Sequence, residues 1–176
     1  MIYAIVSGYK GLIGKALIRE LKNQKSIIIQ LENIPKQDYL SLESNQEEEN
    51  IYTIKYNWEE VSAEKLSNTI KEITNKELNL SHKIFYNLAW KGNKSLTKGD
   101  LELQMKNTYL GVYFLNTAAF IGCEKFVNIG SMEEIIYERM LSSNDFKVSW
   151  SQSCKWYAHA KYTLKDLLSY LAYRKK

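Results

Sequence analysis

The fold is decided by the N-terminal stretch Met1-Ile-Tyr-Ala-Ile-Val-Ser-Gly-Tyr-Lys-Gly-Leu-Ile-Gly14. Its apolar residues 2–6 predict a buried strand, and an amphipathic pattern over residues 12–23 predicts a helix. Between them the chain carries glycines at positions 8, 11 and 14. A strand, a glycine-rich turn and a helix in this order predict a dinucleotide site, because the helix N-terminus offers free N–H groups and a partial positive charge to phosphates.

Each glycine has its own reason in such a site. Gly8 permits the tight turn, Gly11 lets the backbone approach a pyrophosphate, and Gly14 lets the helix pack closely on the strand. A tight turn without a ligand is the alternative, since three glycines alone are a weak signal. The cofactor contacts predicted in this stretch are Gly8, Lys10, Gly11, Leu12, Ile13 and Gly14.

Length and composition are those of one ordinary globular domain, residues 1–176. The chain is 45% apolar and 25% charged, and its net charge of +4 comes from scattered basic residues, which does not predict a nucleic-acid-binding surface. No leader and no apolar run long enough to span a bilayer is visible, and two cysteines make neither a disulfide framework nor a metal site. We therefore expect a cytoplasmic protein with no metal, no membrane contact and no nucleic-acid partner.

Strand and helix patterns alternate along the rest of the chain. This alternation predicts a Rossmann-like, doubly wound α/β fold, in which about five parallel strands in the order 3-2-1-4-5 carry helices on both faces. The stretches 35–50 and 132–153 have no clear pattern and are expected to be loops, the first with a short helical piece. The later predicted strands are 26–31, 51–56, 83–87 and 124–129, and the later predicted helices are 62–76, 100–122 and 154–173.

An acidic residue follows the second predicted strand. Glu32 lies eighteen residues beyond Gly14, where an acid would meet the adenosine ribose hydroxyls of a dinucleotide. A surface glutamate in a loop is the alternative. Lys10 could favour a 2′-phosphate instead, but Glu32 would repel that phosphate, so we expect NAD, with NADP as the second choice.

Tyr157 and Lys161 lie four residues apart near the start of the last predicted helix, so they share one helix face. A phenol has a pKa of about 10 and is a poor base at neutral pH, and a nearby ammonium favours the phenolate. The pair could therefore move a proton on a substrate hydroxyl. Because the chain has 13 tyrosines, a surface pair without chemistry is the alternative.

The order of these features carries more information than any one of them. The glycine turn follows the first predicted strand, an acid the second, Asn87-Leu88-Ala89 the fourth and Ser131 the fifth, and the Tyr/Lys pair opens the next helix. This order resembles the extended short-chain dehydrogenase/reductase family, the NAD-dependent epimerases and dehydratases that modify nucleotide-activated sugars for bacterial surface polysaccharides. The resemblance covers essentially the whole chain, as the N-terminal part of such an enzyme.

The resemblance implies a role for each catalytic candidate. Tyr157 would be the general acid/base of a hydride transfer, and Ser131 would hydrogen-bond the same substrate oxygen. Lys161 would lower the pKa of the phenol and hold the nicotinamide ribose. Asn107 would stand behind these residues, with a polar residue on a helix surface as the alternative.

The resemblance also extends the predicted cofactor site. Leu88 and Ala89 would let the cofactor lie against the end of a strand. Asn57 would contact adenine, and its spacing to Glu60 leaves a plain helix cap as the alternative.

Extended members of the family continue into a C-terminal substrate-binding region, and we expect this chain to lack that region. Three readings therefore stay open: a short NAD(P)-dependent epimerase, dehydratase or reductase, that is, an oxidoreductase or isomerase acting on a nucleotide sugar; a catalytically silent fragment that binds a dinucleotide or a partner; or one half of a split enzyme completed by a separate chain. The family resemblance further implies a homodimer through the helices that carry Asn107 and Tyr157, with Tyr109, Tyr113 and Leu164 as candidate contacts.

Overall fold

The computed structural model describes residues 2–35, 40–44, 48–74, 82–92, 101–143 and 152–174. The chain forms two compact units. The first unit comprises Met1–Ala89 and Tyr113–Asn128, and the second comprises Trp90–Val112 and Ile129–Lys176. The expectation of a single domain stays a prediction.

The first unit is built on a six-stranded sheet with the order β3-β4-β2-β1-β5-β6. All neighbouring strands are parallel except β3, which runs antiparallel to β4. Without β3, this order is the predicted 3-2-1-4-5, so the Rossmann-like prediction is confirmed. The strands are β1 (Ile2–Ser7), β2 (Ile27–Asn33), β3 (Leu40–Ser44), β4 (Ile51–Tyr56), β5 (His82–Asn87) and β6 (Lys125–Asn128).

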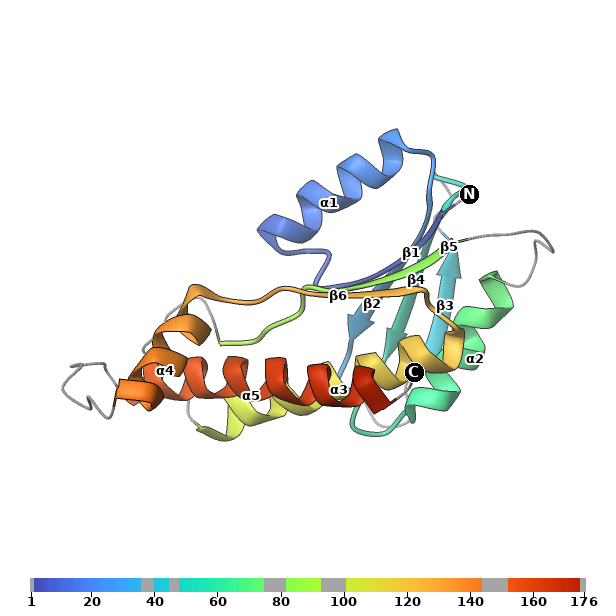
Figure 1. The fold of residues 1–176 in the computed structure, drawn as a ribbon. Coiled ribbons are helices and arrows are strands. Elements are labelled where there is room, and N and C mark those ends of the chain that lie inside the picture. Colours follow the sequence, from blue (N-terminus) through green and yellow to red (C-terminus); the bar gives the residue numbers. More distant parts are fainter. Residues whose placement is uncertain are drawn as a thin grey trace. The chain divides into compact units, whose positions relative to one another are not determined.

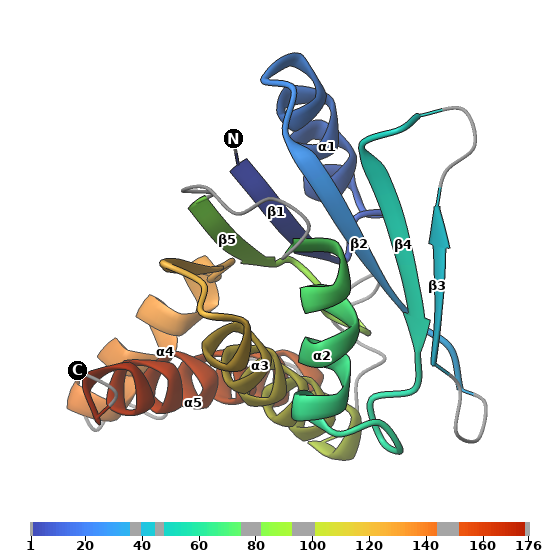
Figure 2. The ribbon, with the colours of Figure 1, turned by 90° about the vertical axis from the view of Figure 1, so that its right-hand side faces the viewer.

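Helices cover both faces of this sheet, because side chains alternate across each strand. On one face, Ala4 and Val6 of β1 pack with Ile18 and Leu21 of α1 (Leu12–Asn23). The helix α2 (Ala63–Thr74) lies on the opposite face (Figures 1 and 2). The C-terminal half of α3 (Leu101–Ile121) belongs to this unit and adds aromatic packing to the sheet. There Phe114 lies 5.2 Å from Phe85, and Tyr113 stacks on Tyr56 at 6.3 Å between ring centroids.

The strand β3 corrects the expectation of a loop with a helical piece over residues 35–50. Its five residues pair with β4 in full register, and Lys55 of β4 forms an ion pair with Glu43 of β3 at 2.8 Å. Only Leu40 and Leu42 give an apolar alternation in this short segment, and Leu42 is still 39% exposed. The strand therefore owes its existence to pairing with β4, which sequence periodicity does not reveal.

The second unit contains the N-terminal half of α3 with α4 (Met132–Ser143) and α5 (Gln152–Arg174). The helices α3 and α5 run side by side (Figures 1 and 2), and Thr108 donates a hydrogen bond to the Ala160 carbonyl at 3.1 Å. A β-carbon at Gly111 would lie 2.6 Å from the Leu164 side chain, so the glycine leaves the space that this leucine occupies between the two helices.

The helix α4 corrects the expectation that residues 132–153 form a loop. It packs on α5, where Tyr137 lies 2.9 Å from the His159 ring nitrogen and Glu138 pairs with Lys165 at 3.3 Å. His159 thus packs on a neighbouring helix. The remainder of the expected loop that follows α4, residues 144–151, lies outside the described residues. The same holds for Trp150, for which the sequence leaves open a contact with a sugar or packing in the core or loop.

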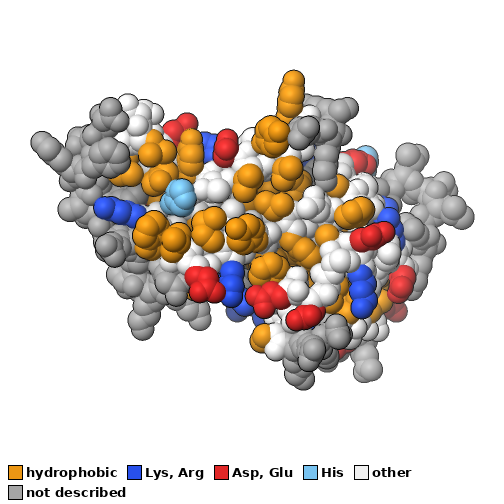
Figure 3. All heavy atoms as spheres, turned by 90° about the horizontal axis from the view of Figure 1, so that it is seen from below, with side chains coloured by type: hydrophobic (Ala, Val, Ile, Leu, Met, Phe, Trp, Pro, Cys, Tyr) orange, Lys and Arg blue, Asp and Glu red, His pale blue; other side chains and the backbone are white. Residues whose placement is uncertain are grey.

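Apolar side chains are exposed in the second unit. Tyr109, Tyr170 and Tyr173 are more than half exposed, and Figure 3 shows apolar side chains gathered on the face that it draws. Two of the three candidate dimer contacts are used within the chain instead. Leu164 is buried against Gly111, and the Tyr113 hydroxyl donates to the Val61 carbonyl at 3.0 Å.

Within the described residues, no helix combines the length and the apolar character needed to cross a bilayer.

Candidate functional site

The glycine turn between β1 and α1 is closed by the backbone. Gly8 has a φ of +71°, which favours glycine, and a β-carbon there would lie 2.6 Å from the Leu88 carbonyl carbon and 2.7 Å from the Ala89 nitrogen. The Gly11 N–H donates to the Gly8 carbonyl at 3.0 Å. Consequently the turn lies directly against the segment that follows β5, and the predicted residues Leu88 and Ala89 meet the glycines.

The first turn of α1 begins at this site. Gly11 is the N-cap residue and offers no side chain to the helix, so the leading N–H groups of α1 are left for a ligand or water. A β-carbon at Gly14 would lie 2.6 Å from the Tyr9 Cα, which explains why helix and turn require glycine there. Leu12 and Ile13 are 90% and 53% exposed, so both present apolar side chains to solvent beside the turn.

A hydrogen-bond network joins three strand ends, and sequence reasoning missed it. The Ser7 hydroxyl donates to Asn87 Oδ1 at 3.0 Å and accepts the N–H groups of Leu88 and Ala89 at 3.3 and 3.4 Å. Asn87 Nδ2 in turn donates to Asn128 Oδ1 at 2.8 Å. Each of the three polar side chains is the last residue of its strand, which is the signal that could have revealed the network.

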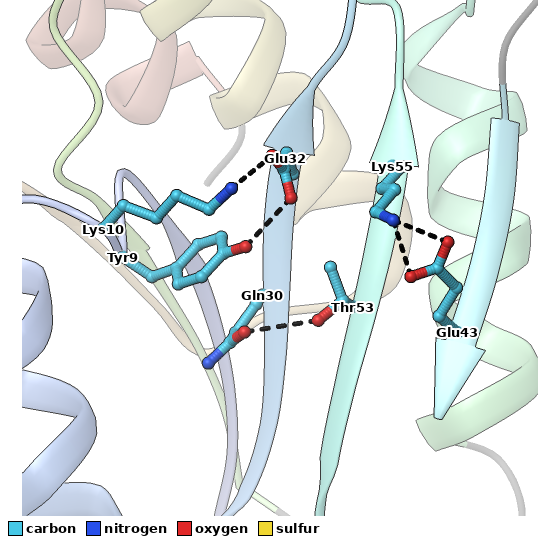
Figure 4. Close-up of polar contacts among 7 residues, drawn as sticks. All are labelled: Tyr9, Lys10, Gln30, Glu32, Glu43, Thr53 and Lys55. Atoms are coloured by element: carbon cyan, nitrogen blue, oxygen red, sulfur yellow. Dashed lines mark hydrogen bonds and ion pairs between the residues drawn. The ribbon is translucent and has the colours of Figure 1, made fainter. Parts of the chain in front are cut away.

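Glu32 and Lys10 are partners. Lys10 extends from the glycine turn to the Glu32 carboxylate near the end of β2, and the Tyr9 hydroxyl donates to the same carboxylate at 3.1 Å (Figure 4). The hydrogen bond from Lys10 lowers the pKa of Glu32, and the same bond raises the pKa of Lys10. Burial, followed by Glu32, raises the pKa of Tyr9. The two charges that sequence reasoning set against each other as cofactor selectors are thus joined in one cluster.

Asn57 follows β4 and does not cap α2. Its Oδ1 accepts the Glu59 N–H at 3.2 Å, and the residue is only 8% exposed. Ser62 caps α2 instead, because its hydroxyl accepts the Lys65 N–H at 3.1 Å. The helix-cap alternative for Asn57 is therefore wrong, and its contact with adenine stays a prediction.

In the second unit, Tyr157 and Lys161 share a neighbour that sequence reasoning did not predict. The Trp90 ring packs edge-on against Tyr157 with 5.7 Å between centroids, and the Lys161 ammonium lies 4.0 Å from the centroid of the same indole. Lys161 also donates to the Ile129 carbonyl at 2.7 Å and is only 5% exposed. Burial lowers the pKa of Lys161 to about 8, while the charge of Glu134 opposes that change.

Asn107 holds the backbone beside Trp90. Its Oδ1 accepts the Lys91 N–H and its Nδ2 donates to the Lys91 carbonyl, both at 2.9 Å, and the residue is 4% exposed. Sequence reasoning left open a polar residue on the helix surface, and this burial excludes it.

Ser131 and Glu134 form a capping box at the start of α4. The Glu134 carboxylate accepts the Ser131 N–H at 2.8 Å, and the Ser131 hydroxyl accepts the Glu133 N–H at 3.3 Å. The Ser131 hydroxyl therefore has a structural partner beside any role toward a substrate. The Ile129 carbonyl, which accepts the hydrogen bond from Lys161, lies only two residues before Ser131 in the chain.

The predicted residues thus fall into two groups. The first unit gathers the glycine turn, Lys10, Glu32 and the Leu88–Ala89 segment, and Asn57 follows β4 in the same unit. The second unit gathers Lys161, Tyr157 and the segment after Ile129 that holds Ser131, while Asn107 supports Trp90 through Lys91.

Comparisons with known proteins point to one family. The model of the NAD dependent epimerase/dehydratase family matches residues 4–175. A search of the curated proteins finds no match.

Solved structures share the fold at low sequence identity. The UDP-N-acetylglucosamine 4-epimerase from Bacillus cereus is 15% identical with a TM-score of 0.61, over 99% of this chain and 50% of that one. The UDP-glucose 4-epimerase from Thermotoga maritima, solved with UDP-glucose, is 18% identical with a TM-score of 0.59, over 97% and 51%. The Bordetella bronchiseptica enzyme WbmG, solved with NAD and UDP, is 14% identical with a TM-score of 0.52, over 94% and 48%. This chain therefore spans about half the length of these structures.

Proposed function

This chain belongs to the NAD-dependent epimerase/dehydratase family, and from that premise we propose that it binds a nicotinamide dinucleotide and supports hydride transfer on a nucleotide-activated sugar. The observation that carries the proposal is the glycine turn. The backbone of the turn lies close to Leu88 and Ala89, and the turn leads into a helix N-terminus without a side-chain cap. Such a helix end favours the binding of a phosphate group.

We propose NAD as the preferred cofactor. The pyrophosphate would lie on the N-terminus of α1 beside Gly11, with Leu12 and Ile13 as its apolar neighbours. Glu32 would accept hydrogen bonds from the adenosine ribose, since its lowered pKa keeps the carboxylate charged. NADP is the second choice, because its 2′-phosphate would have to replace Glu32 as the partner of Lys10.

The residues of the second unit would carry the proton chemistry. A bound oxidised nicotinamide would accept hydride from the sugar carbon. Tyr157 would take the proton from the hydroxyl on that carbon, and Ser131 would donate a hydrogen bond to the same oxygen. Lys161 would hold the nicotinamide ribose beside Tyr157, and Asn107 would keep the surrounding backbone in place through Lys91.

The relatives are about twice as long as this chain, and that observation favours a second candidate. In it the chain binds a dinucleotide without turnover, or it forms one half of an enzyme whose substrate pocket is completed by a separate chain. We also propose a homodimer through α3 and α5, on the exposed side chains of Tyr109, Tyr170 and Tyr173. A monomeric mass in light scattering would remove the dimer.

The deciding experiment is a titration of the purified chain with NAD, NADH, NADP and NADPH, followed by calorimetric heat and by melting temperature. We expect saturable heat and a raised melting temperature for NAD or NADH. A subsequent assay with UDP-sugars would follow epimer formation and nicotinamide absorbance. Cofactor binding without turnover would favour the second candidate, and the absence of binding by all four dinucleotides would overturn the proposal.

A further inference from the structure

We propose that Trp90 is a positioning residue, whose indole face holds the Lys161 ammonium beside Tyr157. The contact itself is a property of the second unit. Its bearing on catalysis rests on the proposed function, in which Lys161 acts beside Tyr157.

One indole ring contacts both members of the pair. Its face lies 4.0 Å from Lys161 Nζ, and it meets the Tyr157 ring at an interplanar angle of 84°. A cation over the face of an indole is attracted by the ring quadrupole, and this attraction grows when the cation is removed from water. Lys161 is 5% exposed, so the ring replaces part of its hydration shell.

The ring is itself held in place from α3. Its Nε1–H donates to Gln104 Oε1 at 2.9 Å, and Gln104 is 1% exposed. Asn107, also on α3, forms hydrogen bonds with both backbone groups of Lys91, the residue that follows Trp90. Since α3 fixes the indole nitrogen and the adjacent backbone, the ring cannot turn away from Lys161 without breaking buried hydrogen bonds.

In the part of the chain that the structure describes, few groups lie around the Lys161 ammonium. The Ile129 carbonyl accepts one of its protons at 2.7 Å, Glu134 of α4 attracts it through charge, and Tyr157 lies one turn away on α5. Against these attractions stands burial, which favours neutral lysine. Of the neighbours that the structure describes, the indole face is therefore the one that both excludes water and stabilises the charged form.

The matched pair Trp90→Phe and Trp90→Leu tests this role. Both variants lose the indole N–H and keep an apolar cover of similar size, but only phenylalanine keeps an aromatic face. The measurement is the pKa of Lys161 by NMR titration of protein labelled at lysine Cε and Nζ, with the signal assigned from its absence in Lys161→Arg. It needs neither cofactor nor substrate.

We expect a lower pKa for Lys161 in Trp90→Leu than in Trp90→Phe, by about 0.5 to 1. Gln104→Leu keeps the indole and removes only its anchor, so the pKa should fall between those of the wild type and Trp90→Leu. Equal pKa values in the Phe and Leu variants would overturn the proposal and leave Trp90 as a plain apolar cover. If Trp90→Leu does not fold, a pKa of Lys161 in Gln104→Leu equal to that of the wild type overturns the proposal equally.

The cofactor titration separates this proposal from the proposed function. Suppose that the wild-type protein binds no dinucleotide, while the pKa of Lys161 is lower in Trp90→Leu than in Trp90→Phe. This result would refute the proposed function and support the positioning of Lys161. Dinucleotide binding together with equal pKa values of Lys161 in the two variants would support the proposed cofactor binding and refute the positioning role of Trp90.

Discussion

Lys10 and Glu32 form an ion pair that links the glycine turn to the end of β2. The pair places a cation and an anion where an adenosine ribose is proposed to bind, so each charge can be removed separately to test its effect on cofactor choice.

Removing the negative charge of Glu32 should weaken the binding of NAD. A hydrogen bond to a charged group contributes about 1.5–3 kcal/mol, so Glu32→Gln should raise the Kd for NAD by roughly tenfold or more and narrow the preference over NADP. Calorimetry with both cofactors measures this. Glu43→Gln is the matched control, because Glu43 belongs to another surface ion pair, with Lys55 (Figure 4). Unchanged NAD affinity in Glu32→Gln would show that the carboxylate does not touch the ribose.

Removing the positive charge of Lys10 should weaken the binding of NADP more than the binding of NAD. The Lys10 side chain is 64% exposed, and exposed pairs contribute roughly 0–1 kcal/mol to stability, so Lys10→Met should keep the melting temperature of the wild type. The loss of a phosphate partner should still raise the Kd for NADP severalfold, with Lys55→Met as the control. Tighter NADP binding in Lys10→Met would contradict the prediction.

Substitutions at Gly14 and Gly11 should have different effects, the first on the stability of the fold and the second on dinucleotide binding. Gly14→Ala brings a β-carbon against the Tyr9 backbone and should lower the free energy of unfolding by about 1–3 kcal/mol. At Gly11 φ is −73° and a β-carbon would lie 3.3 Å from the Gly8 carbonyl oxygen, so Gly11→Ala should stay within about 1 kcal/mol of the wild type. Its dinucleotide affinity should nevertheless fall, because the methyl group occupies the approach of the pyrophosphate. Urea unfolding and calorimetry together test both; full affinity in Gly11→Ala would place the phosphates elsewhere.

Asn107 should be important for stability before any catalysis is measured. Asn107→Ala leaves the N–H and carbonyl of Lys91 without their partner and should lower the free energy of unfolding by about 1–3 kcal/mol. Lys106→Ala on the same helix removes an exposed pair with Glu102 and should change it by less than about 0.5 kcal/mol. Equal effects in the two variants, by thermal or urea unfolding, would refute this structural role for Asn107.

Lys161 should make the stability depend on pH. Its pKa is about 8 in the folded chain and 10.5 in the reference state, so between these values the unfolded chain binds more protons, and stability rises with pH. Relative to Lys161→Met, the free energy of unfolding of the wild type should increase by about 3 kcal/mol from pH 8 to pH 10.5. The difference is the useful quantity, because Cys123, whose pKa burial raises to about 12, titrates in both proteins. A flat difference across this range would mean that Lys161 is not buried in solution.

The sequence predicts the strand order because its apolar strands and amphipathic helices are long and regular. It does not predict β3, whose alternation covers two leucines and depends on pairing with β4. The helix α4 does have a local signal in the sequence, because Ser131 and Glu134 have the spacing of a capping box.

The sequence predicts which residues make up the candidate site, but it does not predict which of them contact one another. Lys10 and Glu32 are 22 residues apart and come together only through the parallel pairing of β1 with β2. Trp90 stands 71 residues before Lys161 in the sequence, and no local pattern indicates that its ring meets the ammonium. Such contacts are set by tertiary packing, which periodicity and motif spacing do not encode.

The closed glycine turn has a consequence for how this protein can change over evolutionary time. A side chain at Gly8 or Gly14 would collide with backbone atoms, which cannot move aside as a flexible side chain can. Inherited variation at this turn is therefore confined to the residues between and beside the glycines, chiefly Tyr9, Lys10 and the exposed Leu12. A lineage that adopted another dinucleotide would do so by exchanging these side chains on an unchanged backbone frame, and the same positions are where directed evolution of cofactor use should begin.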